Sequence, residues 1–226
     1  MNRILLLFLV LSLTHIGAEL ANTELTYFTK PLLMPVLGLY LLSNHRGEIN
    51  TIQKLLLALG FSMLGDILLM FSGLSELYFL GGLGSFLMAH VFYIAFFRNN
   101  IRNKNLNKAL LACLSIYLVG FLYLLKTGLN GILLVAVPIY ALVLASMVYS
   151  AVQFGVQYND GIKRSLSIGA VLFLISDSLI GLFAFTDISI NIPLQRILIM
   201  TSYILAQYLI ISGSSLSIKR LPGKEY

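Results

Sequence analysis

The sequence predicts an all-α integral membrane protein, a single bundle of eight transmembrane helices formed by residues 1–226. Three observations predict this fold. Of the 226 residues, 58% are hydrophobic and only 11% are charged, whereas soluble domains are about a quarter charged. Eight apolar segments approach or reach the length of about 20 residues that crosses a bilayer. The connectors between these segments are short, so no separate soluble domain is expected.

The predicted spans, in chain order, are 3–21, 29–43, 52–72, 78–97, 108–125, 131–152, 165–186 and 194–215. The first follows a basic start and has small residues around Ala18, as a signal peptide does. Its apolar character continues to Ala21 with no polar cleavage region, which favours a first span. The second is short and contains Pro31 and Pro35, so we expect it to be tilted, kinked or only partly buried.

The basic residues predict the orientation, with both termini in the cytoplasm. Of the 15 lysines and arginines, 12 fall on one side of the predicted membrane and 3 on the other. The larger group is Arg3, Arg46, Lys54, Arg98, Arg102, Lys104, Lys108, Lys163, Arg164, Lys219, Arg220 and Lys224; the smaller is Lys30, Lys126 and Arg196. Because the charge is scattered over connectors, we expect a multi-pass protein of the cell membrane (the cytoplasmic membrane if the protein is bacterial) that binds no nucleic acid. The lone Cys113 excludes an internal disulfide and a cysteine metal cluster.

Two aspartates lie inside predicted spans, Asp66 in "GFSMLGDILLMF" and Asp177 in "LFLISDSLIGLF". A charge at mid-membrane costs about 3 kcal/mol, so such residues usually face the bundle interior and act there. The helix rise of ~1.5 Å per residue puts both aspartates, with His90, Tyr203 and Gln207, in the non-cytoplasmic half. We therefore predict a shared pocket, with a purely structural role for each aspartate as the alternative.

The surroundings of the two aspartates are similar. Phe61 to Asp66 and Phe173 to Asp177 are spaced almost alike, and the two spans are four apart. Spans four apart run in the same direction, so a parallel repeat of four helices plus four is conceivable.

Other polar residues of the spans allow two interpretations. His90 with Tyr93, and Tyr203 with Gln207, lie one helical turn apart and are either packed hydrogen-bonding groups or ligands of a substrate. Within the first span, His15 and Glu19 share a face and are interpreted as interfacial or structural.

Lys30 and Arg196 lie on the side where basic residues are scarce, at the start of spans that lead toward the aspartates. A cation in this position binds either the phosphate of a specific ligand or, by snorkelling, lipid phosphates in general.

Five stretches together resemble the YhhN-like lysoplasmalogenase family of multi-pass membrane proteins. They are "FTKPLLMPVL", "FSMLGDILL", "GSFLMAHVFYIAFF", "GAVLFLISDSLIGLF" and "QRILIMTSYILAQYLI", in order from about residue 27 to 212. The resemblance implies an eight-span hydrolase that cleaves the vinyl ether bond of a lysoplasmalogen, giving a fatty aldehyde and a glycerophospho-ethanolamine or -choline. It implies catalytic roles for Asp66 and Asp177, and substrate binding by Lys30, His90, Tyr93, Arg196, Tyr203 and Gln207.

The chemistry of a vinyl ether suits a pair of carboxyls. Protonation of the outer alkene carbon gives an oxocarbenium ion, which water captures, and the hemiacetal then collapses to aldehyde and alcohol. Two carboxyls in different environments provide an acid and a stabilising anion, as in glycoside hydrolysis. Asp66 is assigned provisionally as the acid, with the reverse assignment open, and we expect no metal and no cofactor. The expected partners are a lysophospholipid, water and the membrane lipids.

Two other functions use membrane aspartates. A proton-coupled transporter employs them as a relay, but the polar layer here lies toward one face rather than opening to both. An intramembrane aspartyl protease carries a Gly-x-Gly-Asp element, which Met63 interrupts in this sequence.

Overall fold

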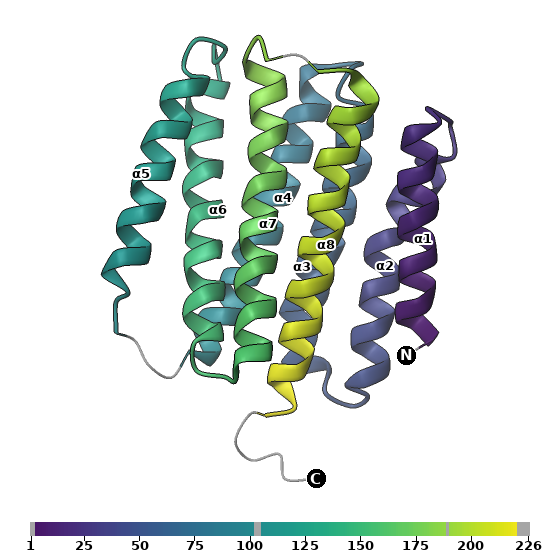
Figure 1. Cartoon of the computed structure of the whole chain (residues 1–226), viewed down its shortest axis with the longest axis vertical. Coiled ribbons are helices and arrows are strands. Elements are labelled where there is room, and N and C mark those ends of the chain that lie inside the picture. Colours follow the sequence, from purple (N-terminus) through teal and green to yellow (C-terminus); the bar gives the residue numbers. More distant parts are fainter. Residues whose placement is uncertain (1–2, 102–104, 189, 221–226) are drawn as a thin grey trace.

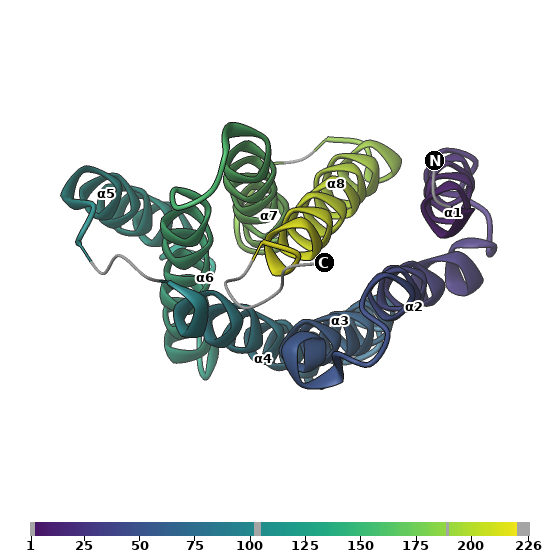
Figure 2. The same ribbon diagram turned by 90° about the horizontal axis from the view of Figure 1, so that it is seen from below.

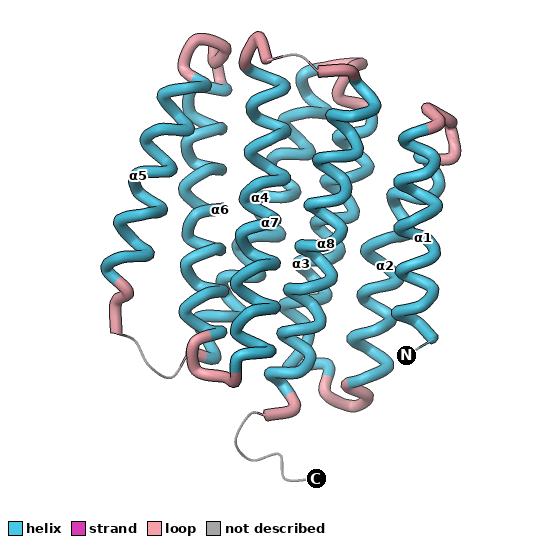
Figure 3. Tube along the Cα trace, viewed as in Figure 1, coloured by secondary structure: helices cyan, strands magenta, loops and turns pink. Residues whose placement is uncertain are grey.

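The computed structural model describes residues 3–101, 105–188 and 190–220, and within these ranges the chain forms eight α-helices and no strand (Figures 1 and 3). The helices are α1 (Arg3–Leu20), α2 (Thr26–Asn44), α3 (Ile49–Met70), α4 (Glu76–Asn100), α5 (Lys108–Leu125), α6 (Leu133–Gly155), α7 (Asp160–Phe185) and α8 (Ile192–Ile218). One helix occupies each predicted span, so the all-α fold is confirmed. All of them except α2 are long and apolar enough to cross a membrane.

Helix α2 is longer than the sequence predicts. It is a continuous helix of 19 residues that includes Pro31 and Pro35. A proline inside a helix removes one backbone hydrogen bond and crowds the preceding turn. Burial compensates for this loss, because Leu33, Leu37 and Leu41 on one face are completely buried against the bundle.

Six helices, α2, α3, α4, α6, α7 and α8, enclose the centre of the bundle, with α1 and α5 at its flanks (Figure 2). Helix α4 packs against α6, and α8 packs against α2, which closes the ring. In each half of the chain, consecutive helices are neighbours, α1 to α4 in the first and α5 to α8 in the second. This equivalent order is what a parallel repeat of four helices would give.

The basic residues separate between the two ends of the bundle as the sequence predicts. Helix α1 begins and α8 ends at the same end of the bundle (Figure 1). The smaller group, Lys30, Lys126 and Arg196, lies at the opposite end, at the start of α2, the end of α5 and the start of α8. The nine described members of the larger group lie at the end that holds the start of α1, and Arg102, Lys104 and Lys224 lie outside the described residues. That this end faces the cytoplasm stays a prediction.

Small residues bring the helices of the aspartates close to their neighbours. At Gly169 of α7, an added Cβ would lie 3.0 Å from the backbone nitrogen of Ile210 in α8. About two turns further along α7, the hydroxyl of Ser176 donates to the carbonyl of Ile199, at 3.1 Å. Close backbone approach of this kind is how membrane helices gain packing energy without a hydrophobic driving force. It fixes α7 and α8, and therefore the residues they carry, against each other.

Candidate functional site

Asp66 of α3 is held by side chains from α8 and α2. The residue is only 2% exposed. The hydroxyl of Tyr203 donates to Oδ2 at 2.8 Å, and Nζ of Lys30 lies 3.8 Å from Oδ1. Both oxygens of this carboxyl therefore face a donor or a cation, which is the arrangement that stabilises an ionised carboxylate.

Asp177 of α7 is held in a different way, by side chains from α6 and α4. Its Oδ2 atom accepts a hydrogen bond from the hydroxyl of Tyr140 and lies 3.2 Å from Nε2 of His90. The hydroxyl of Tyr140 and Nε2 of His90 are also 3.1 Å apart. Both contacts are made by one carboxyl oxygen, so Oδ1 has no hydrogen-bond partner among the described residues and is left for a ligand or a proton.

The two aspartate clusters are arranged equivalently in the two halves of the chain. Asp66 of α3 meets residues from α2 and α8, and Asp177 of α7 meets residues from α6 and α4. Each helix of the first cluster corresponds to a helix of the second: α3 to α7, α2 to α6 and α8 to α4. Each pair is four helices apart along the chain. This is the arrangement that a parallel repeat of four helices would give, and the repeat stays a prediction.

An aromatic wall connects the two clusters. The ring of Phe173 lies edge-on to His90, with centroids 4.8 Å apart, and edge-on to Tyr203, with centroids 5.6 Å apart. Phe86 covers the other side of Tyr203. Gly65 lies against the ring of Phe86. An added Cβ at this position would fall 2.6 Å from that ring, so only glycine leaves the ring in its position.

A second polar layer lies nearer the end of the bundle where α1 begins and α8 ends. Tyr93 of α4 donates to the amide oxygen of Gln207 in α8, whose nitrogen donates to Ser62 of α3 at 3.0 Å. All three side chains are completely buried. They connect α3, α4 and α8 below the aspartates and do not line either of the two cavities next to the aspartates. Binding of substrate by Tyr93 and Gln207 stays a prediction.

An open polar cavity of about 730 Å³, here called the vestibule, lies at the end of the bundle where Lys30 and Arg196 are found. It is enclosed by the end of α1, the α1–α2 connector and the adjoining ends of α2, α3, α7 and α8. Its charged lining residues are Glu19, Glu24, Lys30 and Arg196. Because Lys30 also lies beside Asp66, the vestibule leads directly toward the first aspartate.

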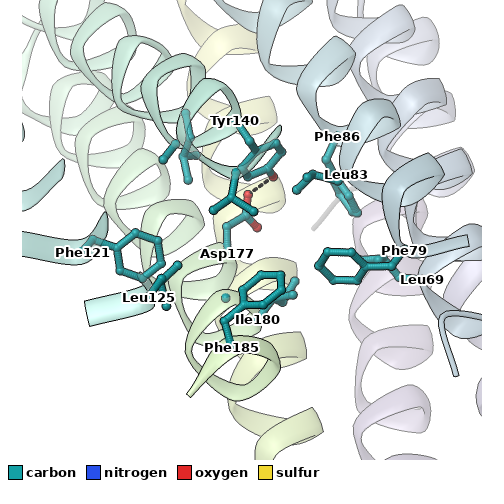
Figure 4. A pocket seen from close by; sticks show the side chains of 14 residues that line it. Leu69, Phe79, Leu83, Phe86, Phe121, Leu125, Tyr140, Asp177, Ile180 and Phe185 are labelled. Atoms are coloured by element: carbon teal, nitrogen blue, oxygen red, sulfur yellow. Dashed lines mark hydrogen bonds between the residues drawn. The ribbon is translucent and has the colours of Figure 1, made fainter. Parts of the chain in front are cut away.

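An apolar cavity of about 40 Å³ lies beside the second aspartate (Figure 4). Its lining is almost entirely hydrocarbon, with the carboxyl of Asp177 and the hydroxyl-bearing ring of Tyr140 as the polar exceptions. Side chains of α5, including Phe121 and Leu125, form its outer wall. A cavity of this volume holds about one water-sized group, so a longer ligand requires side chains to move.

The two cavities share a partition. Leu69 of α3, Phe79 of α4 and Ile180 of α7 line both the vestibule and the apolar cavity. A molecule with a polar head in the vestibule and an apolar chain in the cavity would pass these three residues. Its atoms at the junction would then lie between the Lys30–Asp66 pair and Asp177.

The sequence identified most of this site but missed Tyr140. Lys30 and Tyr203 contact Asp66, His90 contacts Asp177, and Arg196 lines the vestibule. Tyr140 lies in the apolar run of α6, where a tyrosine is ordinary, and only its position two residues after Pro138 in mid-span marks it. His15 donates to or accepts from Thr29 at 2.8 Å and thereby joins α1 to α2, in line with the structural role expected for it.

Within the described ranges, no group of three or more His, Cys, Asp or Glu residues is placed to hold a metal ion. The groups that the site does offer are carboxyls, phenols, an imidazole and two cations. These groups move protons and bind anions.

The fold and the site define a multi-pass membrane protein that places two buried carboxyl centres between a polar vestibule and an apolar cavity. Residues 25–214 match the model of the YhhN family, and the chain belongs to this family. It is similar to the mouse (Mus musculus) protein named lysoplasmalogenase TMEM86B, with 31% identity over 145 residues. The aligned region is 64% of this chain and 56% of the mouse protein, so the chain spans a little over half the length of that relative. No solved structure matches the chain.

Proposed function

We propose that the protein is a lysoplasmalogenase, a membrane hydrolase that cleaves the vinyl ether bond of a lysophospholipid. The observation that carries the proposal is the pair of buried aspartates between a charged vestibule and a hydrocarbon-lined cavity. A lysolipid has the same division, a phosphate head and one chain, and its vinyl ether lies a few bonds below the glycerol. The family and the name of the mouse relative support this substrate class.

The vestibule binds the head group in this proposal. Lys30 and Arg196 are its two cations, and they come from different helices at the membrane surface. The phosphate binds between them by charge-assisted hydrogen bonds. The chain then passes the partition formed by Leu69, Phe79 and Ile180 and continues beside Asp177.

The chain leaves the apolar cavity toward α5. This helix is the least buried of the membrane-spanning helices, with only 11% of its span inside the protein. Phe121 and Leu125 form the wall on that side, and their displacement opens a path from the cavity to the bilayer.

The contacts of the two aspartates support different roles, with Asp177 as the acid, the reverse of the provisional assignment from sequence. Oδ2 of Asp177 accepts a hydrogen bond from Tyr140 and lies within hydrogen-bond distance of His90, as the carbonyl oxygen of a neutral carboxyl would. Oδ1 is left to carry the proton. Asp66 has a cation or a donor at each oxygen, which suits the ionised partner.

The reaction then has three steps, and its atoms balance. Asp177 transfers its proton to the outer vinyl carbon, and the inner carbon and ether oxygen share the positive charge of an oxocarbenium ion. The carboxylate of Asp66 opposes that charge, and a water from the vestibule adds to the inner carbon as its proton returns to Asp177. The hemiacetal collapses to a fatty aldehyde and a glycerophospho-alcohol. The net change consumes one water.

The test is to incubate purified protein in detergent with three lysolipids that share a head group and differ in the chain linkage: vinyl ether, alkyl ether and ester. Mass spectrometry of the products should show fatty aldehyde from the vinyl ether and no cleavage of the other two. Asp177→Asn and Asp66→Asn should each lower the rate by at least about a hundredfold, the lower range for loss of a general acid or base. Cleavage of the ester, or normal turnover by both variants, would overturn the proposal.

A proton-coupled transporter would instead leave the lysolipids intact and take up a solute into vesicles when a pH gradient is applied.

A further inference from the structure

Glu19 is the next-to-last residue of α1, and the two contacts that its side chain makes do not explain its burial there. Its side chain is 8% exposed and lines the vestibule. Nε2 of His15 and a guanidinium nitrogen of Arg196 each lie 3.8 Å from one of its oxygens, beyond hydrogen-bond distance. Its Oε2 atom accepts no hydrogen bond from any residue in the described part of the chain.

A buried carboxylate without hydrogen bonds is costly, because it has lost water and gained little in return. Structural explanations for Glu19 are weak. The hydrogen bond between His15 and Thr29 already joins α1 to α2, and that between Arg196 and Asn22, at 3.3 Å, already joins α8 to the α1–α2 connector. Glu19 therefore faces Arg196 across 3.8 Å but keeps an oxygen that can accept a hydrogen bond from a positively charged ligand.

The charges of the vestibule are balanced in number, and Arg196 lies between the acidic side of the vestibule and its interior, 3.8 Å from Glu19. Two acidic residues, Glu19 and Glu24, face it from the α1 side, and Lys30 and Arg196 are its cations. Because Lys30 also faces Asp66, the phosphate of a ligand lies nearer the bundle axis and the distal part of its head group nearer α1. A head group that is neutral overall, with a phosphate followed by an ammonium, matches this order of charges.

We propose that Glu19 binds the ammonium of a phospho-ethanolamine or phospho-choline head group and so makes the site selective for zwitterionic lysolipids over anionic ones. The inference rests on the proposed function and deepens it. Glu19 lies outside residues 25–214, the part of the chain that matches the family, so its assignment rests on the structure of α1 and not on the family match. Glu19 acts on the head group and takes no part in the chemistry at the vinyl ether.

The first experiment uses the unaltered protein and two vinyl ether lysolipids with the same chain. One carries phosphoethanolamine and the other a phosphoglycerol head group, which lacks the ammonium. We expect kcat/KM to be at least about tenfold higher for the zwitterionic lipid, mostly through KM. Equal values for the two lipids would overturn the inference and leave the proposed function intact, whereas cleavage of neither would refute the proposed function itself.

The second experiment compares Glu19→Gln with Glu76→Gln. Glutamine keeps the size of the side chain and removes its charge. Glu76 is exposed at the start of α4, at the same end of the bundle, and does not line the vestibule. Glu19→Gln should bring the preference for the ethanolamine lipid to within about twofold of unity, with the rate on the glycerol lipid kept or raised, while Glu76→Gln should keep the preference.

A merely structural Glu19 gives a different result. Its replacement would then lower the rates on both lipids by the same factor, or lower the thermal unfolding temperature, without changing their ratio, and this outcome would overturn the inference. Binding of a non-cleavable alkyl ether lysophosphoethanolamine, measured by native mass spectrometry, gives a readout that needs no turnover. It should weaken about tenfold in Glu19→Gln and remain unchanged in Glu76→Gln.

Discussion

Replacing Tyr140 by phenylalanine removes one hydroxyl from the site and leaves the ring that packs edge-on against His90 at 5.5 Å. The lost group is the hydrogen-bond donor to Oδ2 of Asp177. In the proposed mechanism that bond strengthens as Asp177 gives up its proton and becomes charged, so its loss is felt in the transition state more than in the bound substrate. Tyr140→Phe therefore lowers kcat more than it raises KM.

The magnitude follows from the value of a hydrogen bond to a charged group, about 1.5–3 kcal/mol. A barrier higher by this amount slows the reaction by about 10- to 150-fold, since each ~1.4 kcal/mol is a factor of ten. His90 keeps its own contact with Asp177, so activity should fall without being abolished.

The assay is the initial rate of aldehyde release from a vinyl ether lysolipid by purified protein, with Tyr117→Phe as the matched control. The hydroxyl of Tyr117 in α5 is 2.6 Å from that of Ser178 and is not bonded to either aspartate. Its removal also costs one side-chain hydrogen bond, between two neutral hydroxyls, and should leave kcat within about twofold of the unaltered protein. A normal rate for Tyr140→Phe, or equal losses in both variants, would refute the reasoning.

Three further predictions concern the charge, the cavity and the head group. Asp66→Asn keeps the side-chain shape next to Lys30 but removes the anion, so turnover of the vinyl ether should fall by at least about a hundredfold with the circular dichroism spectrum unchanged. Gly181→Val places a side chain in the apolar cavity, where even a Cβ lies 3.0 Å from a ring atom of Phe121, and should lower kcat/KM for long chains more than for short ones. Gly120→Val, where an added Cβ meets nothing within 4 Å, is its control and should be neutral. Lys30→Gln should raise KM about tenfold by loss of a phosphate contact, whereas Lys126→Gln at the same end of the bundle should not, and equal KM values would contradict the assignment.

Local patterns in the sequence were sufficient to predict the helices. Each apolar run long enough to cross the bilayer became a helix, because no other structure short of a closed barrel satisfies the backbone in lipid. The exception in detail is α2. This helix has 19 residues, but its two prolines, Pro31 and Pro35, and its polar start at Thr26 made a shorter helix the natural prediction. The buried face that stabilises it is defined only by the assembled bundle.

The aspartates could be predicted because burying a charge is expensive, so Asp66 and Asp177 had to face partners inside the bundle. The partners themselves depend on which helices are neighbours. Contacts such as Lys30 with Asp66, and Tyr140 with Asp177, join segments far apart in the chain, and no local spacing encodes them. Tyr140 was missed for a second reason, since a tyrosine has an apolar ring and is unremarkable in a membrane helix.

That the carboxylate of Glu19 is buried without a hydrogen bond to Oε2 could not be predicted from the sequence either. Its position near the end of the first span made an interfacial residue the natural interpretation. Only the three-dimensional arrangement shows that α1 packs beside α8 and turns this carboxylate toward the vestibule.

The most direct test of the central claim is the isotopic composition of the products formed in D₂O. Proton transfer to the outer vinyl carbon predicts a fatty aldehyde that carries one deuterium at the carbon next to the carbonyl, trapped as a hydrazone before exchange and analysed by mass spectrometry. The glycerophospho-alcohol should carry no deuterium on carbon, and the labelled aldehyde should form at least about a hundredfold more slowly with Asp177→Asn. An aldehyde free of deuterium at that carbon, or formation of the labelled aldehyde by the Asp177→Asn variant at the rate of the unaltered protein, would contradict the account.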